Sequence, residues 1–154
     1  MTPALPIFNF AVEFHQVSSG SETPVRLCAA RFSEVSGIEA TMEPKAIRVG
    51  GQNFGEVQRV GLTKFATVIL KRGITEAQDA FRWFELVAKG ASSVRLRASI
   101  IQFDTAKAEV LRWTMDDALP IKFRAATYAA SSGEVGVEEL HFVHQKLGLA
   151  VQNG

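Results

Sequence analysis

Hydrophobic residues return at every second position along most of this chain, and this period restricts it to a β-rich fold. The alternation is clearest in residues 8–15, 38–43 and 94–100. Because neighbouring side chains of a strand point to opposite faces, each segment predicts a strand with one buried face. Further strands are expected in VRLCAARF (25–32), EVLRWTM (109–115), IKFRAATY (121–128) and EVGVEELHFVHQKL (134–147).

Turn-forming residues divide these strands. SSGSETP, residues 18–24, is expected to end the first strand, and Pro44 predicts a bulge or an edge position because proline cannot donate a ladder hydrogen bond. The glycine-rich stretch 50–61 predicts a long loop, and long loops within a small domain are usually functional. The strand predicted at 64–71 is hydrophobic at both parities, so both of its faces are expected to be covered.

One segment has the period of a helix. Thr75 offers an N-cap, and Gln78 three residues later completes a capping box. The helix is expected to run to about Lys89, with Gly90 as its stop. Its expected hydrophobic face consists of Ala77, Ala80, Phe81, Phe84, Val87 and Ala88. The predicted fold class is therefore mainly β with one helix (α+β), an antiparallel β-sandwich or barrel.

The size and charge of the chain argue against several classes of protein. With 154 residues, of which 47% are hydrophobic, the chain is long enough for one domain, 1–154, with a single core. Its formal net charge of +1 provides no field that would attract nucleic acid or an anionic membrane. Cys28, the single cysteine, cannot form an internal disulfide and suits a reducing compartment. No long uncharged hydrophobic segment occurs, so a soluble protein made in the cytosol is expected.

The titratable residues give no convincing catalytic or metal site. His141 and His144 are three residues apart in a predicted strand, which sends their side chains to opposite faces and leaves a metal without a ligand set. Asp116 and Asp117 closely precede Pro120 and are better explained by a turn than by paired acid and base catalysis. The chain is therefore expected to have no catalytic residue, metal ligand or cofactor.

Lys71 and Arg72 stand between a predicted strand and the N-terminus of the predicted helix. Gly73 alone follows them, whereas a phosphate-binding loop needs several glycines before its lysine. Two cations at a helix N-terminus oppose the helix dipole, and Glu76 offsets only part of that repulsion. Acidic partners are therefore expected nearby. The alternatives are that both cations face solvent or that they meet a carboxylate cluster on another protein.

Several segments, in order and at matching spacing, resemble one family. They are ARFSEVSGIEA (30–40), the glycine pair at 50–51, LKRGIT (70–75) with the RWFELV helix, VLRWTMDDALPIKF (110–123) and ASSGEVGVEELHFVHQKL (130–147). This set is similar to the tail tube proteins of contractile phage tails and extracellular contractile injection systems (phage-tail-like particles). The resemblance covers nearly the whole chain.

The resemblance implies a structural protein rather than an enzyme. It implies a β-sandwich-like subunit with one helix, hexameric rings of that subunit, and stacking of the rings into a rigid, hollow tube inside a contractile sheath. It also implies that residues 42–61 reach toward the neighbouring ring. The central residues of this inter-ring loop are Gly50, Gly51, Gln52, Asn53, Phe54 and Gly55. Val60 and Gly61 stand where many relatives have a Pro-Gly pair, which sets this loop apart from theirs.

A ring of subunits would also explain where the polar residues of the alternating strands lie. Antiparallel sheets that join edge to edge lose their unpaired edges, and a strand that lines a wet lumen alternates hydrophobic and polar residues. On this basis Arg95, Arg97 and Ser99 are predicted to face the lumen. Lys71, Arg72 and Glu76 are predicted at a subunit or ring boundary, where the two cations would meet carboxylates of another subunit.

The resemblance implies partners and a destination as well. The partners are further copies of the chain, the sheath protein, and baseplate, initiator and tube-terminating proteins, with protein or DNA as candidate cargo and without membrane insertion. Assembly is expected in the bacterial cytoplasm, before the tube becomes part of a phage tail or an injection particle. Two alternatives remain. One is a type VI secretion tube, which has a related fold and carries effectors, and the other is a monomeric β-barrel that binds a small ligand.

Overall fold

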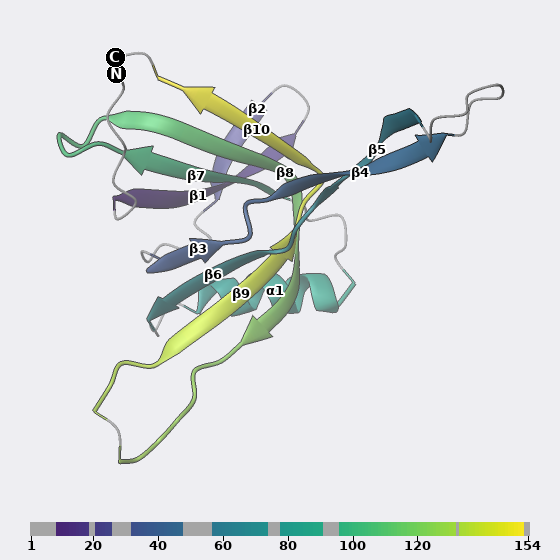
Figure 1. Ribbon diagram of the computed structural model, residues 1–154. Coiled ribbons are helices and arrows are strands. Elements are labelled where there is room, and N and C mark those ends of the chain that lie inside the picture. The colour runs from purple at the N-terminus through teal and green to yellow at the C-terminus, as the bar shows by residue number, and fades with distance from the viewer. Residues whose placement is uncertain are drawn as a thin grey trace.

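The computed structural model describes residues 9–18, 21–25, 32–47, 57–73, 78–90, 96–131 and 133–152. These residues form ten β-strands and one α-helix (Figure 1). In chain order the elements are β1 (Phe10–Ser18), β2 (Ser21–Val25), β3 (Glu34–Ser36), β4 (Ala40–Ile47), β5 (Val57–Phe65), β6 (Val68–Gly73), α1 (Asp79–Ala88), β7 (Leu96–Phe103), β8 (Glu109–Arg124), β9 (Val137–Val143) and β10 (Lys146–Val151). Within this described part, none of the helical structure is long and hydrophobic enough to cross a membrane.

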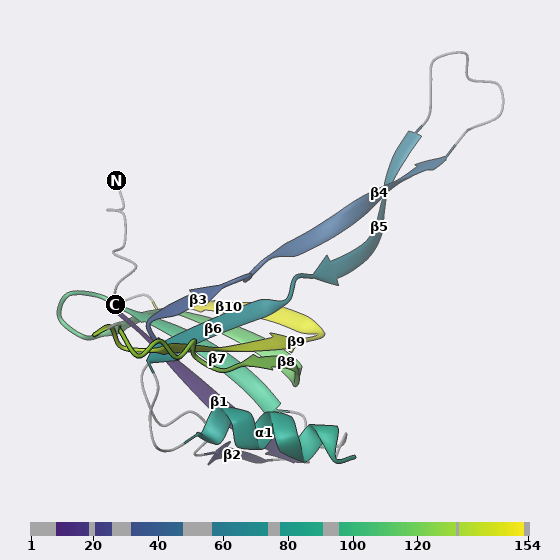
Figure 2. The same ribbon diagram turned by 90° about the horizontal axis from the view of Figure 1, so that it is seen from below.

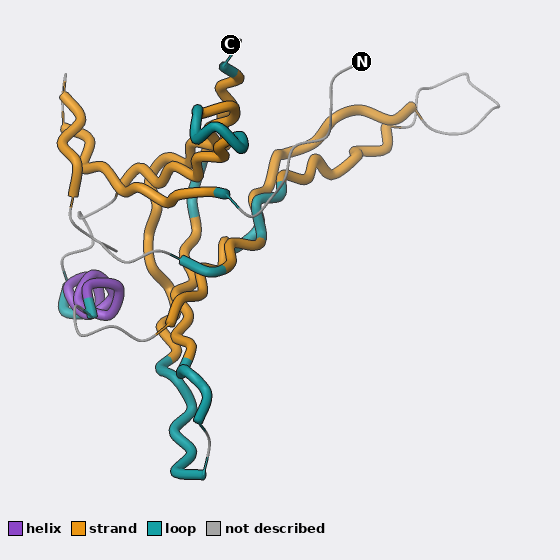
Figure 3. Tube along the Cα trace, turned by 90° about the vertical axis from the view of Figure 1, so that its left-hand side faces the viewer, coloured by secondary structure: helices purple, strands orange, loops and turns teal. Residues whose placement is uncertain are grey.

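Antiparallel pairing links most of the strands into one sheet. Its order is β2-β1-β7-β8-β9-β6-β3, and β10 pairs with β8 beside this path. β4 and β5 form a separate two-stranded sheet that projects from the rest of the molecule, on the side away from α1 (Figures 2 and 3). The predicted fold class, mainly β with antiparallel strands and one helix, is therefore confirmed.

β8 connects the two halves of the large sheet. Its first part, up to Ala118, pairs with β7 and β10, whereas its second part, from Leu119 onward, pairs with β9. Between them Asp117 has a left-handed backbone with φ of 54°, a conformation that aspartate tolerates better than most residues. The predicted turn at Asp116 and Asp117 is therefore wrong, because one strand continues through both residues and changes partners there.

α1 covers the hydrophobic core of the sheet, but with a different face from the predicted one. Trp83 is 1% exposed, and its ring lies edge-on to Phe14 with centroids 5.2 Å apart. Phe81 is 39% exposed and packs against Phe123 instead. Ala88 is exposed too. The prediction is wrong at Phe81 and Ala88 and omits Trp83, because the core takes up the large indole ring on the adjacent side of the helix.

The helix begins later than predicted. It starts at Asp79, and Gln78 before it has a left-handed backbone and makes no side-chain capping bond. The capping-box prediction is therefore wrong at Gln78, and Thr75 lies outside the described residues. The Asp79 carboxylate instead accepts a hydrogen bond from the Ala80 N–H at 3.0 Å and places an acid at the positive end of the helix dipole. Gly90, with φ of 108°, ends the helix as predicted.

The long loop predicted before the central strands is partly replaced by β-structure. β5 begins at Val57, so residues 57–61 belong to a strand and only 48–56 lie between β4 and β5. The register between these strands shifts between Met42 and Pro44, which confirms the bulge predicted from the proline. The strand predicted over 64–71 is divided between two strands, because β5 ends at Phe65 and β6 starts at Val68.

Two other strand boundaries differ from the prediction. Residues 21–25 form β2, which pairs with β1, although the sequence predicts only the end of a strand there. The strand predicted over 134–147 is divided into β9 and β10 by His144 and Gln145. Residues 26–31 lie outside the described part of the chain. The two strands predicted at 109–115 and 121–128 are instead joined in one strand, β8, which ends at Arg124.

Candidate functional site

The sheet formed by β1, β7, β8 and β10 has one hydrophobic and one polar face. Phe14, Ala98 and Met115 lie in register on the hydrophobic face and are buried in the core that α1 covers. On the polar face, rows of residues cross all four strands. One row is Ala11, Ile101, Arg112 and Ala150; the second is Glu13, Ser99, Thr114 and Gly148; the third is His15, Arg97, Asp116 and Lys146.

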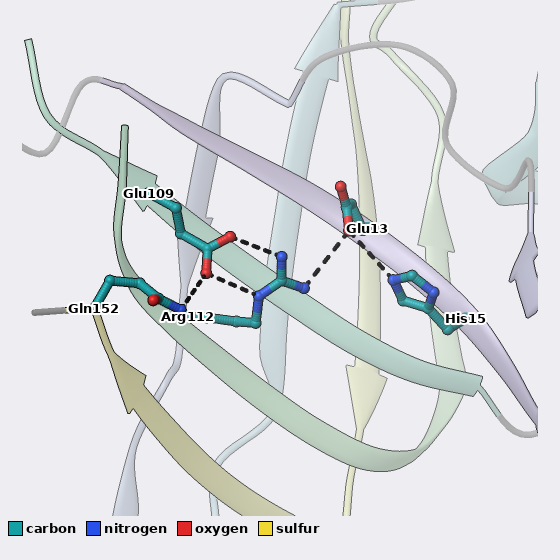
Figure 4. A network of polar contacts seen from close by, with 5 residues as sticks. All are labelled: Glu13, His15, Glu109, Arg112 and Gln152. Atoms are coloured by element: carbon teal, nitrogen blue, oxygen red, sulfur yellow. Dashed lines mark hydrogen bonds and ion pairs between the residues drawn. The ribbon is translucent and has the colours of Figure 1, made fainter. Parts of the chain in front are cut away.

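Arg112 is the centre of a charge network on this polar face, as Figure 4 shows. Its guanidinium donates to both oxygens of the Glu109 carboxylate, at 2.8 and 3.3 Å, and lies 3.7 Å from Glu13 on β1. His15 lies 3.2 Å from the same Glu13 carboxylate, and the Gln152 amide donates to Glu109 at 3.2 Å. The hydrogen bond with Glu109 raises the pKa of Arg112, and the same bond lowers the pKa of Glu109. The network therefore joins β1, β8 and the residue after β10 across β7.

Two of the three predicted lumen residues lie on this polar face, and Arg95 is outside the described residues. The side chain of Arg97 is 30% exposed. Ser99 is only 2% exposed in the single subunit, and that these residues face a lumen stays a prediction. Ser99 stands opposite Glu13 in the register of β1 with β7, and Glu13 lies 3.7 Å from Arg112 on β8.

Arg72 lies in the interior rather than at a boundary between subunits. β6 alternates buried and half-buried residues, and Arg72 falls at a buried position with 1% of its side chain exposed. It contacts the carboxylates of Asp79 on α1 and Glu138 on β9, the latter at 2.5 Å, and its guanidinium lies 5.3 Å from the ring centroid of Phe32. The prediction that Arg72 meets carboxylates of another subunit is therefore wrong, because α1 and β9 of the same chain supply them.

Lys71 lies at the surface, on the opposite face of β6. Its side chain is 37% exposed, and Nζ lies 3.2 Å from Glu34 and 3.6 Å from Glu139. The hydrogen bond with Glu34 is the main cause of its raised pKa. The pKa of Glu139 is lowered, chiefly by a hydrogen bond with His141 at 3.1 Å. A role for Lys71 at a ring boundary stays a prediction, as does that of Glu76, which lies outside the described residues.

β4 and β5 together form an arm with exposed hydrophobic side chains. Met42, Val60 and Leu62 are 60%, 72% and 80% exposed. A two-stranded hairpin is marginally stable in water by itself, and exposed hydrophobic side chains on such an element favour a partner. The predicted inter-ring loop residues 50–55 lie between the two strands of the arm, outside the described residues.

The base of the arm is packed against the body of the subunit. Phe65, the last residue of β5, lies against His144 with ring centroids 5.2 Å apart. His144 is 7% exposed, its Nδ1 lies 3.1 Å from the carbonyl oxygen of Lys146, and burial lowers its pKa. Gly37 has φ of 90°, and a Cβ there would clash with the carbonyl of Thr67. These contacts fix the direction in which the arm leaves the body.

A hydrophobic groove opens beside the start of β1. It has a volume of about 600 Å³, and its hydrophobic lining consists of Phe10, Val35, Ile38, Ile100 and Trp113. Leu149 and Val151 on β10 lie on the same side of the sheet, because Leu149 pairs with Trp113. Leu149 is 50% exposed and Val151 is 57% exposed. The hydrophobic face of the sheet is therefore open at this end.

The two histidines of the HFVH segment lie in different surroundings. No group of three histidine, cysteine, aspartate or glutamate side chains gathers within the described ranges. His141 is half-buried beside Glu139, whereas His144 is buried against phenylalanine rings. Cys28 lies outside the described residues.

The residues that the sequence-based search missed are Glu13, Glu109 and Arg112. Glu13 falls at a polar position of the first alternating segment, and the same parity assigned Arg95, Arg97 and Ser99 to the lumen. The polar position of Glu13 in an alternating segment was therefore the signal from which its place on the polar face could have been predicted. Alternation does not say which strands are neighbours, so the pairing of Glu13 with Arg112 needed the sheet order β1-β7-β8.

Solved structures with a similar fold come from contractile injection systems. A chain of the cryo-EM structure of the anti-feeding prophage (AFP) baseplate, 6-fold symmetrised, is 22% identical, with a TM-score of 0.79 over 98% of this chain and 97% of that chain. A chain of the extracellular contractile injection system PVC sheath–tube complex in the extended state is 17% identical, with a TM-score of 0.77 over 97% and 93%. Hcp1 from Flavobacterium johnsoniae is 12% identical, with a TM-score of 0.56 over 92% and 96%. These likenesses confirm the fold.

Sequence comparison adds the family. No curated protein sequence matches the chain. Residues 6–148 match the family model described as T4-like virus tail tube protein gp19, which is well over half of the chain. The chain therefore belongs to the T4-like virus tail tube protein gp19 family.

Proposed function

We propose that the chain is the repeating subunit of the hollow inner tube of a contractile injection system or phage tail, in which hexameric rings stack inside a sheath. The observation that carries this proposal is the arm formed by β4 and β5. Its hydrophobic residues Met42, Val60 and Leu62 are exposed although the arm is anchored to a packed body. A second copy in the neighbouring ring would cover them, as the chain's family leads us to expect.

The open groove beside β1 is the proposed receiving surface for that arm. Five of its eight lining residues are hydrophobic, and the exposed Leu149 and Val151 extend this hydrophobic surface along β10. Burial of hydrophobic side chains stabilises an interface by about 25 cal/mol per Å² of buried hydrophobic surface. A contact of this kind repeated around a ring would give a tube its rigidity.

The polar face of β1, β7, β8 and β10 is the proposed wall of the channel. A lumen has to be wet, and this face presents charged side chains while the opposite face packs under α1. Arg97, the predicted lumen residue with an exposed part, lies on it. We assign the outer surface to α1, whose exposed Phe81 and Leu86 are candidates for contact with the sheath.

The remaining partners follow from the same proposal. They are the baseplate or initiator complex that starts a tube and the protein that terminates it, and the chain acts without a cofactor and without catalysis. Assembly in the bacterial cytoplasm and incorporation into a tail or injection particle belong to this proposal. The type VI secretion tube is the weaker alternative, because the likeness to Hcp1 has the lower TM-score, 0.56 against 0.79.

Electron microscopy of the purified chain over a concentration series, together with its native mass, tests the proposal. The expected result is six-fold rings with a central hole that stack into tubes, with a baseplate initiator added where rings alone do not polymerise. Leu62→Asp should leave rings but abolish stacking, because it places a charge on the arm's 80% exposed hydrophobic surface. Leu62→Met, which keeps a hydrophobic side chain, should stack normally. Tubes formed by Leu62→Asp would refute the role of the arm.

A further inference from the structure

The polar face that we assign to the channel wall contains acids and bases in equal number. Where β8 pairs with β7 and β10, up to Asp116, the acidic residues of this face are Glu13, Glu109 and Asp116, and its basic residues are Arg97, Arg112 and Lys146. This balance is local. The near-neutral charge of the whole chain does not require it, because a face with charges of one sign could be balanced by opposite charges elsewhere on the protein.

Both arginines are paired with carboxylates on the face itself. Arg112 is held between Glu109 at 2.8 Å and Glu13 at 3.7 Å. Arg97 donates to Asp116 at 2.7 Å. Lys146 stands directly opposite Asp116 in the register of β10 with β8. The field of an ion pair is weak at distances greater than the separation of its two charges. That separation is a few ångströms here, which is less than the Debye length of about 8 Å at physiological salt.

The pairing also determines what the arginines can bind. A guanidinium that binds phosphate does so through its N–H donors, and Arg112 directs donors to both oxygens of Glu109. Ser99 and Ile101, which face the same side on β7, are each 2% exposed and leave little of their own surface for a ligand. Nucleic-acid binding depends on unpaired cations that release counterions from phosphates, and this face presents its cations together with carboxylates.

From these observations we infer that the channel wall is charge-compensated by pairing between neighbouring strands, so that it retains neither polyanions nor polycations and serves as a surface for passage. The inference rests on the proposed function, because it takes this face to line the channel. The cargo it fits is a polypeptide with mixed surface charge, which meets neither strong attraction nor strong repulsion along such a wall.

The test compares binding of a short fluorescent DNA duplex and a fluorescent oligolysine peptide at low and physiological salt. Fluorescence anisotropy is measured on the full-length chain, both as monomer and in any assembled form. The variant Glu13→Gln with Glu109→Gln removes both carboxylates that hold Arg112. Its matched control is Glu34→Gln with Glu85→Gln, which changes the net charge equally but removes exposed partners of Lys71 and Lys89 away from this face.

The wild type and the control should bind neither probe at physiological salt. The variant should bind DNA at low salt at least roughly tenfold more tightly than the control, and added salt should abolish the difference. The reciprocal variant, Arg97→Gln with Arg112→Gln, should gain oligolysine binding and serves if the first variant fails to fold. Circular dichroism checks folding in each case.

Tight binding of either probe by the wild type would overturn the inference, as would equal binding by the variant and its control. The proposed function fails separately, through the absence of rings and tubes in electron microscopy. In that case, DNA and oligolysine binding by the monomer still tests the charge balance, because the polar face is open to solvent in the single subunit. Rings whose channel binds DNA tightly would sink the inference and leave the tube intact.

Discussion

Replacing Arg72 by methionine should destabilise the folded subunit strongly. The substitution keeps most of the side-chain volume but removes the cation between Asp79 and Glu138, whose side chains are 11% and 4% exposed. Removing one partner of a buried ion pair costs about 3–5 kcal/mol, because the remaining charge is left buried and uncompensated. Total stabilities of domains are roughly 5–15 kcal/mol, so this is a large fraction. For a chain of this length, we expect the melting temperature to fall by about 10 °C.

The assay is urea unfolding of the monomeric subunit, followed by tryptophan fluorescence, because Trp83 lies in the core beside this site. The transition midpoint should fall with little change in the slope. Lys71→Met is the matched control, since Lys71 is the neighbouring residue and its pairs with Glu34 and Glu139 are exposed. Its midpoint should stay near that of the wild type.

The result that would refute this reasoning is an Arg72→Met subunit with the wild-type midpoint that no longer assembles. Such a protein would mean that Arg72 acts between subunits, as the sequence alone predicts. A lowered midpoint with normal assembly of the remaining folded protein supports the interior role.

Three further predictions concern the core and the base of the arm. Trp83→Ala should lower the unfolding free energy by about 3–5 kcal/mol in urea unfolding followed by circular dichroism, because Trp83 is 1% exposed and contacts Phe14, and an unchanged midpoint would contradict the core assignment. Gly37→Ala should lower the melting temperature through its positive φ and the clash with Thr67, whereas Gly133→Ala, with nothing near its added Cβ, should not; equal effects would refute the close approach. Burial lowers the pKa of His144 below its ordinary 6.5, so the stability it contributes is complete above that pH and is lost as the pH falls through the lowered pKa. His144→Phe should therefore flatten the dependence of unfolding free energy on pH below about 6.5, and an unchanged slope would contradict it.

The sequence predicts the β-rich fold and its single helix because both periods are local. The alternation in β1 and β7 places Phe14, Leu96 and Ala98 in the core as expected. Asp117 shows where local reasoning fails. An aspartate pair before a proline has the composition of a turn, but strand pairing on both sides keeps the backbone extended and confines the disturbance to one left-handed residue.

The candidate site is less predictable, because its contacts join distant parts of the chain. Arg72 and Glu138 are 66 residues apart, and nothing in the local pattern brings them together. The sequence does predict that acids must lie near Lys71 and Arg72, and the structure supplies them from within the chain. Likewise, polar parity places Arg97 and Ser99 on the polar face, but it does not predict that Ser99 is only 2% exposed or that Arg112 pairs with Glu13 across β7.

A cryo-EM reconstruction of the assembled protein is the most direct test of the central claim. We predict a hollow tube of stacked six-fold rings in which Arg97 and Arg112 line the channel, α1 lies on the outer surface, and the arm of each subunit contacts the next ring. An assembly with the polar face of β1, β7, β8 and β10 on the outside, or a chain that stays monomeric with an initiator present, would contradict the account.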